Sequence, residues 1–272
     1  MTYEGTEAPV PSSGRKARTV VLIFVSTVLT TATALALLPI GLVTLFRARR
    51  LYAAVATQLA RGLLRLWGIR VIVHQDRPFP ATQTVYVSNH SSTIDLFVLV
   101  ALGLPNTRFF MWGRLRKYIP LGIIAQLMGT FFTVEQTRPA ERTRIFQRAD
   151  RTLRRTRESV YLSPEGKRVV TGEIGHFNKG AFHLATSLHA PIVPLYFRIP
   201  READPGLGYD PQRCTVHVHV RAPIDTDDWR LDELMQNKER VREMFVGWHR
   251  ESRAPERDEP TTTSTAIPGF AQ

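Results

Sequence analysis

Apolar positions run without interruption near the N-terminus, where residues 19–46 carry no charged side chain. About 20 apolar residues suffice to cross a bilayer, so this run predicts a membrane helix. It is longer than the core of a usual secretory signal, which is the competing interpretation. Pro39 and Gly41 can break a helix, so a shorter span over residues 20–38 or a bent hairpin inserted into one leaflet is also compatible with the sequence. Cations flank both ends, so the positive-inside rule gives no clean orientation.

A second pattern follows in residues 51–68, where apolar residues recur at helical spacing. Leu59 and Leu63 fall on one side of the predicted helix, and Arg61 and Arg65 fall on another. The pattern predicts an amphipathic helix, which either lies on the membrane surface or packs on the core of the domain.

From residue 70 onward the pattern alternates between strand-like and helix-like segments. The strand-like segments, rich in Val, Ile, Phe and Tyr, cover residues 70–75, 84–87, 108–112, 130–134, 159–162, 192–198 and 215–221. The helix-like segments cover residues 94–102, 115–128, 139–158, 177–188 and 231–252. This alternation predicts an α/β fold with a mixed, mostly parallel sheet flanked by helices, preceded by the membrane helix.

These patterns divide the chain into four regions. Residues 1–18 are a polar, basic N-terminus, and residues 19–50 form the membrane segment. Residues 51–252 are expected to fold as one domain, because a segment of this length can bury a sizeable core. Residues 253–272 are polar and rich in threonine, so this tail is predicted to be disordered.

The charge balance predicts an anionic partner. The chain has 36 Lys and Arg against 24 Asp and Glu, a net charge of +12, which favours phosphate-bearing partners such as anionic lipid. Arginines are concentrated in residues 139–158, where they form either a solvated helix face or a contact with anionic lipid. Nucleic acid is not expected, because Phe146 is the only aromatic residue among these arginines.

The cysteine and histidine residues limit which cellular compartment and which metal sites the sequence is compatible with. Cys214 is the single cysteine, so the chain cannot form an internal disulfide, which favours a catalytic domain on the reducing, cytoplasmic side. A zinc site built from several cysteines is excluded. His217 and His219 share one face of a predicted strand, but no third ligand is visible, so we expect two exposed histidines and no metal.

The segment YVSNHSSTIDLF, residues 86–97, places His90 and Asp95 where a strand pattern gives way to a helical one. In open α/β sheets this end of a strand is where ligands bind. A carboxylate that accepts one imidazole N–H leaves the other ring nitrogen as a base. The alternative is structural: Asp95 favours the helix N-terminus and His90 caps the loop.

Five motifs in order decide between these interpretations. NHSSTID (89–95) resembles the N-H-x-x-x-x-D signature of the glycerolipid acyltransferases, which include the 1-acylglycerol-3-phosphate and lysophospholipid acyltransferases. SPEGKR (163–168) is similar to the family's P-E-G-T-R block, and FNKGAFHLA (177–185) to its F-K-x-G-A segment. MGTFFTVE (128–135) and APIVPLYF (190–197) resemble its G-x-x-F and V-P-V blocks. The resemblance covers about residues 51–225.

The resemblance implies an acyltransferase domain over residues 51–252 that works without a cofactor. It would move an acyl group from acyl-CoA or acyl carrier protein to the free hydroxyl of a lysophospholipid. The leading candidate for this acceptor is 1-acylglycerol-3-phosphate. His90 would be the general base, and Asp95 would orient it, with no covalent enzyme intermediate. Backbone N–H groups near the start of the 92–102 helix are candidates to stabilise the oxyanion.

The same resemblance implies a binding site for the acceptor lipid. Gly166 permits close approach of a ligand, Glu165 could hydrogen-bond the acceptor hydroxyl, and Arg168 offers a two-pronged contact for phosphate. The remaining binding candidates are Asn89, Lys167, Lys179 and Arg138. The chain departs from the family pattern at Lys167, usually threonine, at Val169, usually serine, and at Glu135 and Gln136, where an arginine is usual. Either Lys167 and Arg138 replace that charge, or the acceptor is not a simple glycerol phosphate.

The rival interpretation is a catalytically weak module that is anchored to anionic membranes and only binds lipid. The presence of His90, Asp95 and Glu165 argues against it.

Overall fold

The structure is a computed structural model that describes residues 13–169, 173–200 and 213–253. The predicted N-terminal region is covered only from residue 13 onward. The predicted C-terminal tail lies outside the described residues, except for Arg253.

A seven-stranded sheet forms the centre of the fold, in the order β1-β7-β6-β2-β5-β3-β4. Every neighbouring pair is parallel except β6 and β7, which are antiparallel. The mixed, mostly parallel sheet predicted from the sequence is therefore confirmed. The strands are β1 (Ile69–Gln75), β2 (Val85–Ser88), β3 (Thr107–Trp112), β4 (Phe131–Thr133), β5 (Ser159–Leu162), β6 (Ile192–Arg198) and β7 (Cys214–Val220).

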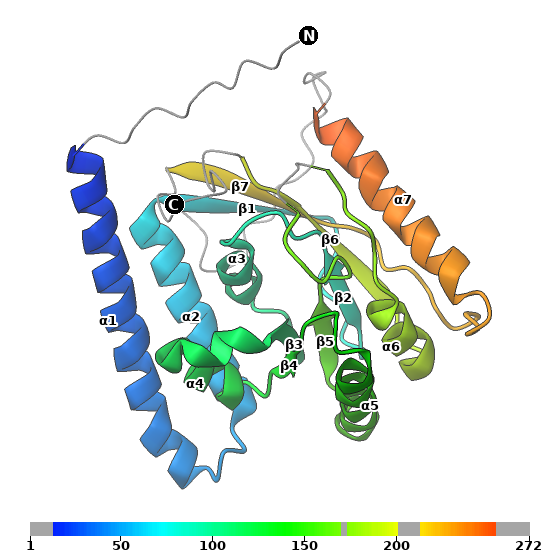
Figure 1. The fold of residues 1–272 in the computed structure, drawn as a ribbon, viewed down its shortest axis with the longest axis horizontal. Helices are drawn as coiled ribbons and strands as arrows, with labels where there is room; N and C mark the ends of the chain where they lie inside the picture. The colour runs from blue at the N-terminus through cyan, green and yellow to red at the C-terminus, as the bar shows by residue number, and fades with distance from the viewer. Residues whose placement is uncertain (1–12, 170–172, 201–212, 254–272) are drawn as a thin grey trace.

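Helices cover both faces of the sheet, as Figure 1 shows. One face carries α2 (Arg49–Trp67), α3 (Asp95–Leu102) and α4 (Ile119–Leu127), and the other carries α5 (Pro139–Thr156), α6 (Gly180–Leu188) and α7 (Leu234–Arg253). Successive side chains of a strand point to opposite faces, so β2 sends Tyr86 into the first core and Val85 and Val87 into the second. Burial on both faces explains why the strands have continuous apolar runs.

The N-terminal helix α1 (Ser13–Val43) is continuous through Pro39. The helix break that the shorter span over residues 20–38 assumed does not occur at Pro39. Instead, α1 packs lengthwise on the domain, with Ala34 and Leu37 buried, and Gly41 lies close to Leu127 of α4. These contacts continue on either side of Pro39, which removes only one backbone donor.

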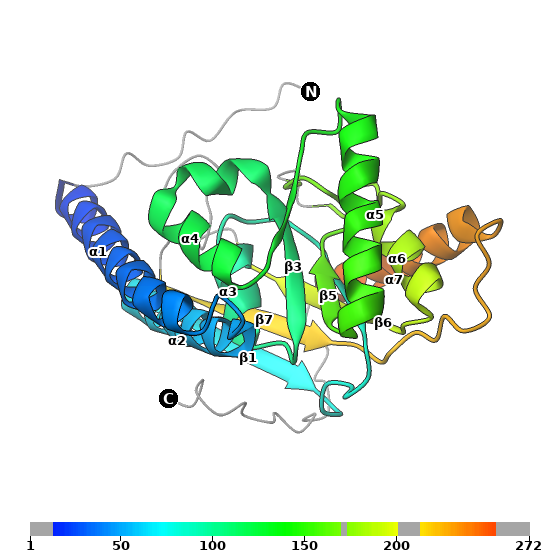
Figure 2. The ribbon, with the colours of Figure 1, turned by 90° about the horizontal axis from the view of Figure 1, so that it is seen from below.

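The outer side of α1 stays apolar and exposed. Val20, Phe24 and Val28 are among the large side chains that face outward. Within the described part of the chain, α1 is the one helix that is long and apolar enough to cross a membrane. It turns after residue 43 into α2, which runs back alongside it in both views (Figures 1 and 2). The predicted amphipathic helix α2 buries its leucine side against the sheet and α3.

Three predicted helix starts are displaced. The segment 115–128 is divided into a 3₁₀ turn, η1 (Gly113–Lys117), and α4, which begins at Ile119. Pro120 suits the division, because proline is tolerated in the first turn of a helix, and Tyr118 just before α4 has non-helical dihedral angles. Helix α6 begins three residues later than predicted, at Gly180, and α7 begins at Leu234 instead of residue 231.

A buried ion cluster ties the start of α2 to the sheet. Glu158, 8% exposed, accepts hydrogen bonds from Arg108 Nε at 2.7 Å and from Arg49 Nε at 3.1 Å. Arg108 also donates to the carbonyl of Gly129. The cluster joins residues that are far apart in sequence, so the pattern of apolar positions does not predict it.

The two strand histidines are not exposed as expected. His217 and His219 are half-buried on β7, where His74 of β1 hydrogen-bonds His217 at 2.9 Å and stacks on His219 with ring centroids 4.4 Å apart. Burial and neighbouring positive groups lower the pKa of His219 to about 4. Among the described residues, no three His, Cys, Asp or Glu side chains are grouped so that they could hold a metal ion.

Candidate active site

The loop after β2 begins the site, at the end of the central parallel strands. Asn89 fixes this loop to β6, because its amide group donates to the carbonyl of Phe197 at 2.9 Å and accepts from the N–H of the same residue at 2.8 Å. Ser88, the last residue of β2, hydrogen-bonds the buried Tyr161 hydroxyl of β5 at 2.7 Å. The backbone that carries His90 is therefore held by strands on both sides.

His90 and Asp95 are in direct contact. The Nδ1 atom of His90 lies 2.7 Å from Oδ2 of Asp95, which is 3% exposed. The same oxygen accepts the backbone N–H groups of Ser91 at 2.9 Å and Ser92 at 3.1 Å. Asp95 therefore shapes the loop before α3 and orients the imidazole at the same time, so the catalytic and the structural interpretations describe one arrangement.

The pKa of His90 reflects opposing influences. Burial lowers the pKa of His90, but the hydrogen bond and the negative charge of Asp95, with a smaller contribution from Glu165, outweigh burial and leave the pKa raised. The side chain is one third exposed, so the Nε2 side of the ring remains open to a substrate. A base of raised pKa holds an abstracted proton more firmly.

Glu165 hydrogen-bonds the backbone of two separate segments of the site. One carboxylate oxygen accepts the N–H of His90 at 2.6 Å, and the other accepts the N–H of Gly175 at 2.7 Å. Burial raises the pKa of Glu165 to about 7, although both of these donors favour its charged form. Through the hydrogen bond to the backbone of His90, Glu165 positions that residue, and the contact with the acceptor hydroxyl that the motif implies stays a prediction.

The turn at Gly166 depends on Asn178, which the sequence analysis did not single out. The side-chain amide of Asn178 donates to the carbonyls of Pro164 and Glu165 at 2.9 and 3.0 Å. Gly166 has a φ of +67°, and a Cβ atom there would lie 2.8 Å from the Asn178 amide nitrogen. Glycine is therefore required on both counts. Asn178 lies within the FNKGAFHLA motif, which was the available signal.

The predicted cationic residues do not all gather at the dyad. Arg168 is next to it, because its guanidinium donates to Thr93 Oγ1 at 2.6 Å, inside the NHSSTID loop. Lys167 and Lys179 are exposed, and Lys179 precedes the first turn of α6. Arg138 is exposed at the start of α5 and pairs with Glu141 at 2.8 Å.

The backbone donors proposed for the oxyanion are partly engaged. The N–H groups of Ser91 and Ser92 bind Asp95, and the N–H of Ile94 binds Ser92 Oγ at 3.2 Å. Those amides serve the loop itself.

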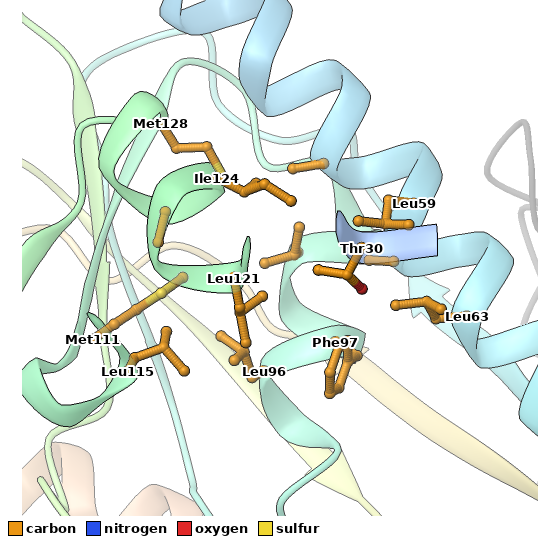
Figure 3. Close-up of a pocket in the computed structure, with 14 residues that line it drawn as sticks. Thr30, Leu59, Leu63, Leu96, Phe97, Met111, Leu115, Leu121, Ile124 and Met128 are labelled. Carbon is orange, nitrogen blue, oxygen red and sulfur yellow. The ribbon is translucent and has the colours of Figure 1, made fainter. Parts of the chain in front are cut away.

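An apolar cavity lies between α1, α2, α3 and α4 (Figure 3). Its walls include Leu96 and Phe97, the two residues that follow Asp95, and Leu59 and Leu63 of α2. Thr30 of α1 contributes the one polar side chain among the residues that line it. The composition suits a hydrocarbon chain.

Comparison with known proteins agrees with the motifs. The Acyltransferase family model matches residues 70–198, which run from β1 to the end of β6. The 1-acyl-sn-glycerol-3-phosphate acyltransferase of Saccharomyces cerevisiae is 30% identical over 166 residues, covering 60% of this chain and 54% of the relative. The alpha form from Bos taurus is 30% identical over 201 residues, covering 68% of this chain and 65% of the relative. The matches therefore span less than two thirds of these relatives.

The fold also matches a solved structure. The crystal structure of the 1-acyl-sn-glycerophosphate acyltransferase from Thermotoga maritima aligns with a TM-score of 0.68, covering 89% of this chain and 98% of that one at 18% identity. At this identity the likeness establishes the arrangement of the elements. The motifs, the family match and the curated relatives together show that residues 70–198 of this chain form an acyltransferase domain.

Proposed function

We propose that the protein transfers an acyl group from a thioester donor, acyl-CoA or acyl carrier protein, to the free hydroxyl of 1-acylglycerol-3-phosphate. The observation that carries the proposal is the 2.7 Å contact between His90 Nδ1 and Asp95 Oδ2 at the mouth of the sheet. The names of the curated relatives support this acceptor.

Each residue of the site has a separate role in the proposed reaction. His90 Nε2 takes the proton of the acceptor hydroxyl as its oxygen attacks the thioester carbonyl. Asp95 supports the imidazolium that forms, and Glu165 holds the backbone of His90 in place. When the tetrahedral intermediate collapses, the carbon–sulfur bond breaks and the imidazolium returns the proton to the departing thiolate. No group of the protein becomes acylated.

The binding roles follow from the surroundings of the dyad. We assign the apolar cavity to an acyl chain, because every side chain that lines it except Thr30 is apolar. Arg168 binds the acceptor phosphate from its place beside Thr93, and Lys167, Lys179 and Arg138 supply a weaker positive field around it. Asn89 acts through the loop that it holds.

The exposed apolar side of α1 attaches the protein to the membrane that contains the acceptor, with residues 51–252 on the cytoplasmic side. A catalytically weak lipid-binding module is the second candidate, because the same cavity and helix would serve it.

A radiolabelled acyl-transfer assay separates the two candidates. The purified full chain is incubated with labelled acyl-CoA or acyl carrier protein and a panel of lysophospholipids, beside His90→Ala and the exposed control His183→Ala. We expect transfer to 1-acylglycerol-3-phosphate by the parent and the control, and a loss of about 10³-fold in His90→Ala. Equal rates in all three proteins would remove His90 from the chemistry, and binding without transfer would favour the lipid-binding module.

A further inference from the structure

Residues 111–121, which run from the end of β3 through η1 into α4, include some side chains that line the apolar cavity and others that are exposed to solvent. Met111, Leu115 and Leu121 point inward and line the apolar cavity (Figure 3). Between them, Trp112, Tyr118 and Ile119 point outward and are 53%, 62% and 69% exposed. A segment that already builds a cavity wall would normally leave polar side chains on its outer side. The exposure of three large apolar or aromatic side chains within eight residues is typical of an interaction site.

The charges around these side chains specify the kind of partner. Arg114, Arg116 and Lys117 lie within the same segment, and the sequence has no acidic residue between Asp95 and Glu135. Arg114 stacks over the Trp112 ring at 4.9 Å while it pairs with Glu135, and Arg116 stacks over Phe132 at 4.2 Å. Aromatic side chains flanked by cations suit the interface of an anionic bilayer, where rings sit at headgroup level and cations meet lipid phosphates.

The position of the segment agrees with this partner. Helix α4, which follows the segment, packs against α1, and the two lie side by side in Figures 1 and 2. The segment 112–119 therefore leads directly into a helix that contacts α1. The cavity lies between them, with Thr30 of α1 on one wall and Leu115 on another.

Another exposed apolar pair shows that exposure alone is not the signal. Leu231, just before α7, and Met235, in its first turn, are 61% and 49% exposed. Their surroundings are acidic, because Asp225, Asp227, Asp228, Asp232 and Glu233 lie within the preceding and intervening residues. An anionic surface would repel this region, so it serves as a matched control.

We propose that residues 112–119 form a second membrane contact beside α1, which inserts Trp112, Tyr118 and Ile119 at the interface of an anionic phospholipid bilayer. The contact holds the cavity wall against the lipid, so that an acyl chain passes between bilayer and cavity without crossing water. The proposal concerns membrane docking and does not depend on the catalytic role of His90.

Site-directed fluorescence tests the contact locally, independently of binding through α1. In the full chain carrying Cys214→Ser, an environment-sensitive dye is attached at Tyr118→Cys or, as the control, at Met235→Cys. Vesicles of phosphatidylcholine and phosphatidylglycerol carry spin-labelled lipid as the quencher. We expect at least a twofold quench and a blue shift for the dye at 118, little change at 235, and a weaker effect in vesicles of phosphatidylcholine alone. Equal quenching at the two positions, or a dye at 118 that stays in water on vesicle-bound protein, would overturn the proposal.

A functional readout complements the dye. The triple variant Trp112→Ser, Tyr118→Ser, Ile119→Ser should lose about tenfold in acyl transfer to an acceptor embedded in vesicles, with little loss for an acceptor in detergent micelles. Leu231→Ser, Met235→Ser is the control. Equal losses in vesicles and micelles would contradict a membrane role. Absence of transfer by the parent would contradict the proposed function, while the dye would still decide the membrane contact.

Discussion

Asp95 and Glu158 are both buried carboxylates that accept several hydrogen bonds, but their partners differ. Asp95 binds His90, five residues away, whose ring is one third exposed. Glu158 binds Arg49 and Arg108, 109 and 50 residues away, and its pair with Arg108 is buried in the core. The charge of Asp95 can influence a substrate, because Asp95 contacts the exposed ring of His90. The charge of Glu158 is paired with arginines and stabilises the fold. Substitution of each carboxylate should therefore affect different measurements.

The largest effect is expected from Asp95→Asn. The asparagine keeps the size of the side chain but removes the charge that supports the imidazolium, so kcat/KM should fall about 10³-fold, or about 4 kcal/mol. Initial rates and a urea unfolding curve should be measured on the same preparation. A large loss of stability with a proportionate loss of activity would show that Asp95 acts only through the loop.

Glu158→Gln should instead reduce stability and leave activity nearly unchanged. Removing the charge leaves Arg108 buried beside an amide, so the free energy of unfolding should fall by about 3 kcal/mol, with kcat changed little in the folded protein. Burial by itself raises the pKa of Glu158, but hydrogen bonds from Thr156 and Arg108 and the nearby arginine charges leave it lowered. Its stabilisation is therefore present above the ordinary carboxyl pKa and is lost as pH falls. Asp232→Asn, in an exposed pair with Arg230, is the control and should cost less than about 1 kcal/mol.

Glu165→Gln should reduce activity by less than Asp95→Asn and by more than Glu158→Gln. A glutamine can accept only one of the two N–H groups, from His90 and Gly175, and turns its own donor toward the other. We expect kcat to fall roughly 30-fold, about 2 kcal/mol, with KM for the acceptor nearly unchanged. A rise in KM at constant kcat would instead make Glu165 an acceptor-binding residue, as the motif alone indicated.

The smallest effect is expected from Lys167→Thr, which restores the residue usual in the family. Lys167 is exposed, so its field on a phosphate is screened, and the KM for 1-acylglycerol-3-phosphate should rise by about threefold. KM for the acyl donor should not change. An unchanged preference across the lysophospholipid panel would remove Lys167 from headgroup recognition.

Much of the fold could be predicted from the sequence, because local patterns determine it. The strands of the sheet are close to the predicted ranges, since each is a short run of branched and aromatic residues bounded by turns. The start of α4 was missed because Pro120 lies within an otherwise helical pattern. The packing of α1 along the domain was also not predictable, because an uncharged helix looks the same whether lipid or protein covers it.

The candidate site was predictable in part, for a related reason. His90 and Asp95 are close in sequence, so their contact follows from a strand-to-helix turn. The grip of Glu165 on His90 spans 75 residues and depends on parallel pairing of β2 with β5. Motif spacing could indicate that Glu165 belongs to the site, but only the packed structure shows that its oxygens are bound to backbone N–H groups.

The pH dependence of kcat/KM tests the central claim most directly. If His90 is the base and Asp95 raises its pKa, the rate of the parent protein should fall on acidification with an apparent pKa above the ordinary histidine value of about 6.5. Asp95→Asn should move this midpoint to lower pH, because the negative charge that favours the protonated ring is gone. The same profile in Glu165→Gln should keep the midpoint above the ordinary value, which separates His90 from the neighbouring carboxyl group. A midpoint that stays in place in Asp95→Asn, or a rate independent of pH from 5 to 8, would contradict the account.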